Sequence, residues 1–184
     1  MKKISVKEIM VSIDEYATVG QEATLLEACQ ALEEAQEKFN RDRYRHRAII
    51  ILDKKQRVVG KLSQLDVIKA LEPKYDKILD SKVLSRSGFS PGFLKSMVKE
   101  QQLWVGTLED ICRTGAKIKV KNVMYTPQTD EYVTAETTMD QAIHQLVMGR
   151  HQSLLVTSGQ KIVGILRLSD VFKVVCSKVR ECSI

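Results

Sequence analysis

The sequence repeats one pattern of apolar and polar residues, once in each half of the chain. Residues 6–10 read VKEIM, and residues 120–124 read VKNVM. After each opening come a short extended stretch, an amphipathic helix, two apolar strands joined by a polar turn, and a second helix. Because an internal repeat sets the architecture of a chain, this doubled unit predicts an α+β fold built from two similar halves.

The spacing of apolar residues predicts the elements of each copy. In both first helices the apolar residues recur at steps of three and four, which gives each helix one apolar face. These residues are Leu25, Ala28, Cys29, Leu32 and Ala35 in the first copy and Met139, Ala142, Ile143, Leu146 and Val147 in the second. The apolar runs 48–52 and 154–156 predict buried strands, and further strands at 57–62 and 161–166 follow polar turns.

Residues 73–118 separate the two copies and differ from them in composition. Pro73 ends the first unit, because proline cannot continue the preceding helix. One helical stretch is expected over 93–112, and its apolar side chains are too numerous for a free linker. We therefore expect this helical insert to pack on the repeats or on a partner chain, and we place the first repeat at 1–72 and the second at 119–184.

Composition narrows the class of protein without identifying a function. The chain has 184 residues, of which 43% are hydrophobic and 28% are charged, so it can bury a core and is too apolar for a disordered tail. Its net charge of +6 suits an anionic ligand without requiring one. Four cysteines without a CxxC pair indicate reduced core thiols. We expect a cytoplasmic location, with neither a signal peptide nor a membrane span.

A closing motif completes each copy. Residues 59–67 read VGKLSQLDV, and residues 163–171 read VGILRLSDV. The helix starts at 23–28 and 137–142 also correspond. With these motifs in register at both ends, the chain resembles a tandem pair of cystathionine-β-synthase (CBS) domains, an arrangement known as the Bateman module.

The resemblance implies a fold and a class of ligand. Each repeat is expected to be a small three-stranded sheet with flanking helices, and a pseudo-twofold axis is expected to relate the two repeats, with the insert outside them. Two clefts between the repeats are expected to take AMP, ADP, ATP or S-adenosylmethionine, and no other cofactor is required. The module is expected to be non-enzymatic, to form a homodimer, and to pass a ligand-driven conformational change to an unknown protein target.

The resemblance also implies a Ser/Thr-x-x-Asp motif after the last strand, which grips the ribose and the nearest phosphate. Ser63 and Asp66 fit this motif, whereas the second copy keeps Asp170 but has Arg167 at the hydroxyl position. An ionised carboxylate accepts hydrogen bonds from two sugar hydroxyls, and a hydroxyl at a helix N-terminus suits phosphate. The cleft of Ser63 and Asp66 is therefore the stronger candidate.

Two further sets of residues are candidates by resemblance. Basic residues before the first core strand would meet phosphate: His46 and Arg47 in one copy, Arg150 and His151 in the other. Residues of the early extended segments would line the adenosine: Thr18, Val19, Val133 and Thr134.

Other interpretations of these residues stay open. Ser63 and Asp66 also form a helix capping box, and Asp170 after Ser169 is also a plain cap. A structural or dimerisation module without ligand is one alternative, and RNA or DNA binding through Arg41 to Arg47 is a less favoured one, since such charge runs are usually solvated loops. The histidines lack metal-ligand spacing, and no catalytic or phosphate-loop motif indicates an enzyme.

Overall fold

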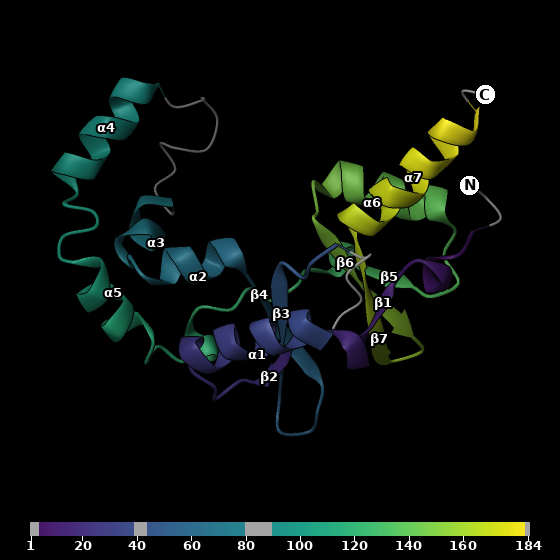
Figure 1. Ribbon diagram of the computed structural model, residues 1–184, viewed down its shortest axis with the longest axis horizontal. Helices are drawn as coiled ribbons and strands as arrows, with labels where there is room; N and C mark the ends of the chain where they lie inside the picture. Colours follow the sequence, from purple (N-terminus) through teal and green to yellow (C-terminus); the bar gives the residue numbers. More distant parts are fainter. Residues whose placement is uncertain (1–3, 39–43, 80–89, 183–184) are drawn as a thin grey trace.

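Two small sheets form the centre of the molecule. The computed structural model describes residues 4–38, 44–79 and 90–182. One sheet has the order β2-β3-β4, from β2 (Thr18–Gly20), β3 (Ala48–Leu52) and β4 (Val58–Ser63). The other has the order β1-β7-β6-β5, from β1 (Val11–Ser12), β7 (Lys161–Arg167), β6 (Ser153–Ser158) and β5 (Tyr132–Thr134). Each contains one parallel pair followed by an antiparallel hairpin, so the doubled unit is confirmed (Figure 1).

Helices flank both sheets, which confirms the α+β class. The first repeat has α1 (Leu25–Lys38) and α2 (Gln64–Ala70), and the second has α6 (Met139–Gly149) and α7 (Leu168–Cys182). Short 3-10 helices precede the strands: η1 (Val6–Glu8), η2 (Ile13–Glu15), η4 (Val120–Asn122) and η5 (Thr129–Glu131). At the start of α1, the N–H and hydroxyl of Thr24 donate to the Glu27 carboxylate at 2.6 and 2.9 Å, which satisfies groups that a helix end leaves open.

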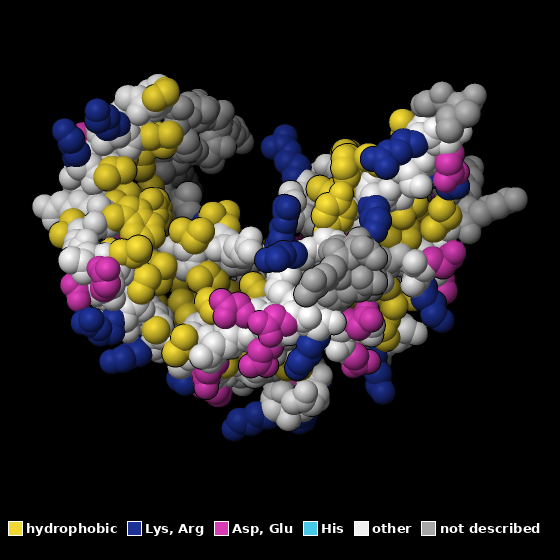
Figure 2. All heavy atoms as spheres, viewed as in Figure 1, with side chains coloured by type: hydrophobic (Ala, Val, Ile, Leu, Met, Phe, Trp, Pro, Cys, Tyr) yellow, Lys and Arg dark blue, Asp and Glu magenta, His cyan; other side chains and the backbone are white. Residues whose placement is uncertain are grey.

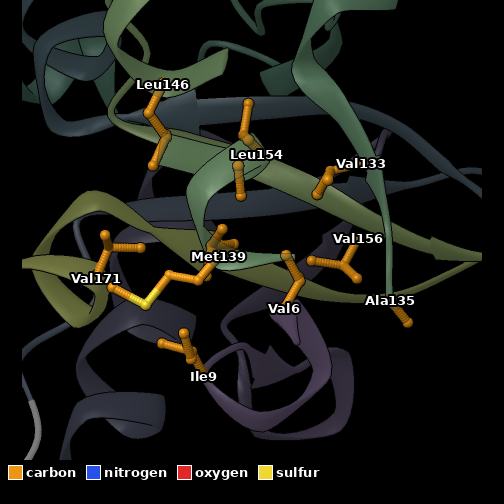
Figure 3. Packing of buried hydrophobic residues seen from close by; sticks show 11 residues of the cluster. Val6, Ile9, Val133, Ala135, Met139, Leu146, Leu154, Val156 and Val171 are labelled. Atoms are coloured by element: carbon orange, nitrogen blue, oxygen red, sulfur yellow. The ribbon is translucent and has the colours of Figure 1, made fainter. Parts of the chain in front are cut away.

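The opening segment of each repeat lies in the core of the other repeat. The Val6 N–H donates to the Thr137 carbonyl at 2.9 Å, and Val6 is buried in the second core beside Met139 and Leu154 (Figure 3). In return, the Val120 N–H donates to the Ala23 carbonyl at 2.9 Å, and Val120 is buried in the first core. The second sheet has a fourth strand for this reason: β1 crosses over from the first repeat and pairs with β7.

A third apolar cluster joins the two sheets face to face. Side chains alternate along a strand, so Ile49 and Ile51 of β3 point to the core of their own repeat while Ile50 points to the other repeat. Ile50 packs there with Leu155 of β6 and Ile165 of β7. Residues at the ends of β3, β4, β6 and β7 that lie on the same sheet face as Ile50, Leu155 or Ile165 are therefore positioned between the repeats.

The insert is two main helices, so the prediction of one helix over 93–112 is wrong. After α3 (Lys74–Leu79) come α4 (Pro91–Glu100) and α5 (Leu108–Gly115). Between them the backbone of Gln102 and Trp104 has φ of 48° and 57°, a left-handed conformation that no α-helix continues through. The buried Glu72 carboxylate holds this bend by accepting the Trp104 N–H at 2.6 Å, which also docks the insert on the end of the first repeat.

The molecule is hollowed between two arms. Helices α2 to α5 form one arm and α6 with α7 the other, and apolar side chains gather on both (Figure 2). An apolar groove between α6 and α7 is lined by Val147, Leu168, Phe172 and Val175. Within the described ranges, no helix is long and apolar enough to span a membrane.

The four cysteines are free thiols, but only two are even partly buried. Cys29 and Cys176 are half-buried, and Cys112 and Cys182 are exposed. The expectation of core thiols is therefore wrong for Cys112 on α5 and for Cys182 at the end of α7, because both side chains face solvent.

Candidate functional site at the ends of the last strands

Strand register makes Ser63 and Arg167 equivalent positions of the two repeats. Ser63 ends β4 opposite Ala48, and Arg167 ends β7 opposite Ser153. The next residue of each copy starts a helix and donates its N–H to a carbonyl just before the first core strand, Gln64 to Arg47 at 3.2 Å and Leu168 to Gln152 at 3.0 Å. The two repeats therefore have the same backbone at this point and differ in the side chain.

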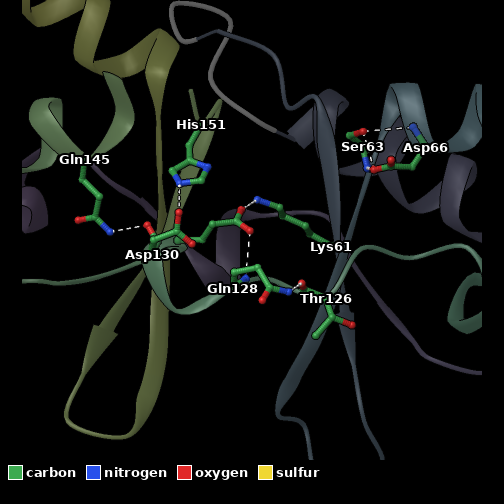
Figure 4. A network of polar contacts seen from close by, with 9 residues as sticks. Lys61, Ser63, Asp66, Thr126, Gln128, Asp130, Gln145 and His151 are labelled. Atoms are coloured by element: carbon green, nitrogen blue, oxygen red, sulfur yellow. Dashed lines mark hydrogen bonds and ion pairs between the residues drawn. The ribbon is translucent and has the colours of Figure 1, made fainter. Parts of the chain in front are cut away.

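Ser63 and Asp66 form a closed capping box at the start of α2. The Asp66 carboxylate accepts the Ser63 N–H at 2.9 Å and the Ser63 hydroxyl at 2.6 Å, and the Asp66 N–H donates to the Ser63 oxygen at 3.2 Å (Figure 4). Both side chains are half-buried. An ionised carboxylate has about four lone-pair sites, so these two bonds leave acceptor capacity for a polar ligand.

Arg167 and Asp170 form a buried ion pair at the equivalent place. The guanidinium donates to both carboxylate oxygens of Asp170, at 2.5 and 2.7 Å, and the two residues are 4% and 7% exposed. The same guanidinium donates to the Tyr44 carbonyl at 2.8 Å and lies 3.2 Å from the fully buried His46 Nδ1. Asp170 is therefore not a plain cap with Ser169. Its carboxylate is held by Arg167, whose side chain also contacts the first repeat.

The equivalent histidines have different surroundings. The ring of His46 packs on Tyr16 with the centroids 4.4 Å apart, while His151 Nε2 lies 3.1 Å from a carboxylate oxygen of Asp130. Burial raises the pKa of Tyr16 to about 12, the nearby charge of Arg167 opposes the shift, and the charge of Asp170 adds to it. Gln145 holds the Asp130 backbone by donating to its carbonyl at 2.7 Å (Figure 4).

The other predicted residues divide into exposed and core positions. Arg47 and Arg150 are exposed beside the two histidines, and Arg150 ends α6 in a left-handed conformation. Val19 and Val133 pack into the cores of their own repeats, so they offer a ligand only their backbone. Thr18 is half-buried, and the exposed Thr134 hydroxyl lies 2.9 Å from that of Thr137.

Sequence reasoning missed a polar cluster between the repeats. Lys61 of β4 pairs with Glu131 of η5, and the Tyr125 hydroxyl also bonds to Glu131, which is 2% exposed. Burial raises the pKa of Glu131, but hydrogen bonds from Lys61, Tyr125 and the Gln128 N–H outweigh it and hold that pKa below its ordinary value. The available signal was Lys61 itself, because this charged residue stands at the position where the second copy of the closing motif has the apolar Ile165.

Two other kinds of site come into question, a metal site and a nucleic-acid surface. In the part of the chain that the structure describes, no group of three or more His, Cys, Asp and Glu side chains is placed to hold a metal ion. Arg41 and Arg43 of the arginine-rich stretch lie outside the described residues, and Arg45 and Arg47 are exposed.

Comparison with known families gives the class to which this fold belongs. The model of the CBS domain matches residues 6–73 and again 120–177, and together these segments cover more than half of the chain. The chain belongs to the CBS-domain family, with two CBS domains in tandem. No curated protein matches the sequence.

Solved structures share the fold at low sequence identity. A CBS-domain structure of a membrane protein from Sphaerobacter thermophilus is 18% identical, with a TM-score of 0.61 over 94% of this chain and 88% of the other. A CBS-domain protein of unknown function from Bacillus anthracis is 18% identical, with a TM-score of 0.59 over 96% of both chains. CBSX2, solved in complex with AMP, is 18% identical, with a TM-score of 0.54 over 94% and 96%.

Proposed function

We propose that this protein is a non-enzymatic regulatory module that binds an adenosyl ligand between its CBS repeats, at Ser63 and Asp66. The single observation that carries the proposal is the position of these residues at a strand-to-helix junction facing the other repeat, half-buried and with spare acceptor capacity on Asp66. Membership of the CBS-domain family and the AMP complex of CBSX2 support the same class of ligand.

The chemistry of the junction suits a nucleoside monophosphate. Asp66 accepts hydrogen bonds from the ribose hydroxyls, and the Ser63 hydroxyl lies at the positive end of α2 beside the first phosphate. Arg150 from the other repeat supplies positive charge beside His151, with Arg47 exposed on the near side. The backbone of the extended segments at Thr18, Val19, Val133 and Thr134 is the proposed contact for the adenosine.

Regulation follows if the ligand bridges the two repeats. A ligand held by Asp66 on one side and by Arg150 on the other stabilises one arrangement of the repeats over others, in proportion to its difference in affinity for them. A protein target then recognises that arrangement. We include self-association in the proposal, because the apolar groove between α6 and α7 leaves Val147 and Phe172 64% and 57% exposed.

Isothermal titration calorimetry of AMP, ADP, ATP and S-adenosylmethionine, with GTP as control, tests the proposal on wild type and on Asp66→Asn. Loss of hydrogen bonds to a charged acceptor weakens binding by about 10- to 100-fold. Glu27→Gln is the matched control, because Glu27 closes an equivalent capping box at α1. Equal affinity in wild type and Asp66→Asn contradicts the site, and no binding of any adenosyl compound contradicts the function.

A further inference from the structure

Arg167 fills the place that Ser63 leaves open in the other copy. Both residues end the last strand of their repeat and both precede an aspartate by three residues. The serine side chain stops at its own helix, where it contacts Asp66. The arginine side chain continues past its own helix into the first repeat and is almost fully buried there.

The guanidinium joins the two repeats through bonds to both of them. On its own side it holds the Asp170 carboxylate at 2.5 and 2.7 Å, and on the other side it donates to the Tyr44 carbonyl at 2.8 Å and approaches His46 Nδ1 at 3.2 Å. An arginine is charged at every physiological pH and donates in a fixed planar geometry. These contacts occupy the Asp170 carboxylate and the Tyr44 carbonyl, polar groups that would otherwise be open to a ligand at this place.

We propose that the Arg167 side chain is a built-in occupant of the second cleft, which ties the repeats together there and leaves this chain one ligand site. The inference rests on the proposed function for the number of ligands, and on contacts in the structure for the tie. The two ends of the interface then differ, because the Asp170 end is closed permanently while the Asp66 end closes only when ligand is present.

Two exchanges between the copies test this occupancy. Arg167→Ser gives the second copy the Ser-x-x-Asp order of the first, so the N–H and hydroxyl of the new residue can satisfy Asp170 as Ser63 satisfies Asp66. Ser63→Arg places a guanidinium before Asp66. Calorimetry with AMP is expected to give one site per chain in wild type, two in Arg167→Ser and none in Ser63→Arg, and the exposed Arg180→Ser is the control with one.

Amide hydrogen exchange provides a readout that needs no ligand. Without the guanidinium, the segment 44–50 loses its tie to β7, so its amide protons are expected to exchange at least about tenfold faster in Arg167→Ser than in wild type or Arg180→Ser. Unchanged exchange in this segment overturns the tie, whatever the calorimetry shows.

The outcomes separate this inference from the proposed function. Two sites in wild type, or one site in both wild type and Arg167→Ser, overturn the occupancy while the proposed function stands. If neither protein binds AMP, ADP, ATP or S-adenosylmethionine, the proposed function fails, and faster exchange at 44–50 in Arg167→Ser still supports Arg167 as the residue that joins the repeats.

Discussion

Single residues at equivalent positions give the two ends of the repeat interface different chemistry. Val11 pairs with Ile165 at one end, and at the other end the equivalent residues Tyr125 and Lys61 pair in the same way. Glu131, which bonds to both Tyr125 and Lys61, has Ala17 as its equivalent in the first repeat, because each directly precedes the first strand that pairs in its repeat. The Val11–Ile165 pair is thus apolar, whereas the Tyr125–Lys61 pair surrounds the buried Glu131 carboxylate, whose hydrogen bond is the chief cause that raises the pKa of Tyr125 to about 12.

Lys61→Ile is expected to destabilise the fold by about 3 kcal/mol, because it leaves the buried Glu131 charge without its cation. Urea unfolding measures the loss. The triple variant Lys61→Ile, Glu131→Ala and Tyr125→Val introduces the residues found at the equivalent positions, Ile165, Ala17 and Val11, so it is expected to recover most of this stability. A single variant as stable as wild type would show that Glu131 does not depend on Lys61.

The pH dependence of that loss has a defined sign. The pKa of Glu131 is lower in the folded protein than its ordinary 4.5, so the ion pair stabilises the fold above about pH 4.5 and stops doing so as the pH falls through the lowered value. In Lys61→Ile the buried carboxylate is better tolerated when protonated. The stability difference between wild type and this variant is therefore expected to shrink on acidification, and a difference that is constant from neutral pH downward contradicts the ion pair.

Among the elements, β1 lies against a strand at a residue with no side chain, Gly164. It pairs with β7 at Ser12 and Gly164, and a Cβ on Gly164 would lie 2.5 Å from the Val11 carbonyl oxygen. The equivalent Gly60 has the Met124 sulfur at 2.5 Å instead, at the end of a flexible side chain. Backbone cannot move aside as a methionine can, so β1 requires glycine more strictly than the matching segment of the other repeat does.

Gly164→Ala is therefore expected to destabilise the protein by about 2 kcal/mol, in the range of overpacked cores, and to do so more than Gly60→Ala. Chemical denaturation of the two variants side by side measures this difference. Equal losses would mean that β1 shifts as easily as Met124 does.

Most helices and strands of the repeats were predictable from the sequence, whereas several contacts between them were not. Motifs in register predicted the strands at 48–52 and 161–166 and the helices around them, because periodicity reports local burial. They did not predict that β1 pairs with β7, because an apolar Val6 indicates burial without saying in which core. The bend between α4 and α5 depends on the buried Glu72, and the position of the Arg167 side chain depends on His46. Both are tertiary contacts, which no local sequence pattern records.

At the scale of the whole molecule, the exchanged opening segments make the repeats interdependent. Val6 and Ile9 complete the core of the second repeat, and Val120 with Val123 completes that of the first. Together with the cluster of Ile50, Leu155 and Ile165 between the sheets, this arrangement leaves neither repeat a finished core of its own.

Val6→Ala is therefore expected to weaken the second repeat, and Val120→Ala the first, each by about 2 kcal/mol. Hydrogen exchange should show lost protection at β5 to β7 in the former variant and at β2 to β4 in the latter. If Val6→Ala lowered protection only in the first repeat, and Val120→Ala only in the second, the exchange of segments would be contradicted.

The same interleaving bears on the order in which the protein is made. Val6 leaves the ribosome long before Thr137 and Met139, the residues it contacts in the finished fold, and the first repeat lacks Val120 until the insert has been synthesised. Contacts between residues so distant along the chain are slow to form. A nascent chain that has emerged only as far as the insert therefore exposes apolar surface on both sides of its first sheet, which makes this stage of synthesis the one at which a chaperone has most to bind.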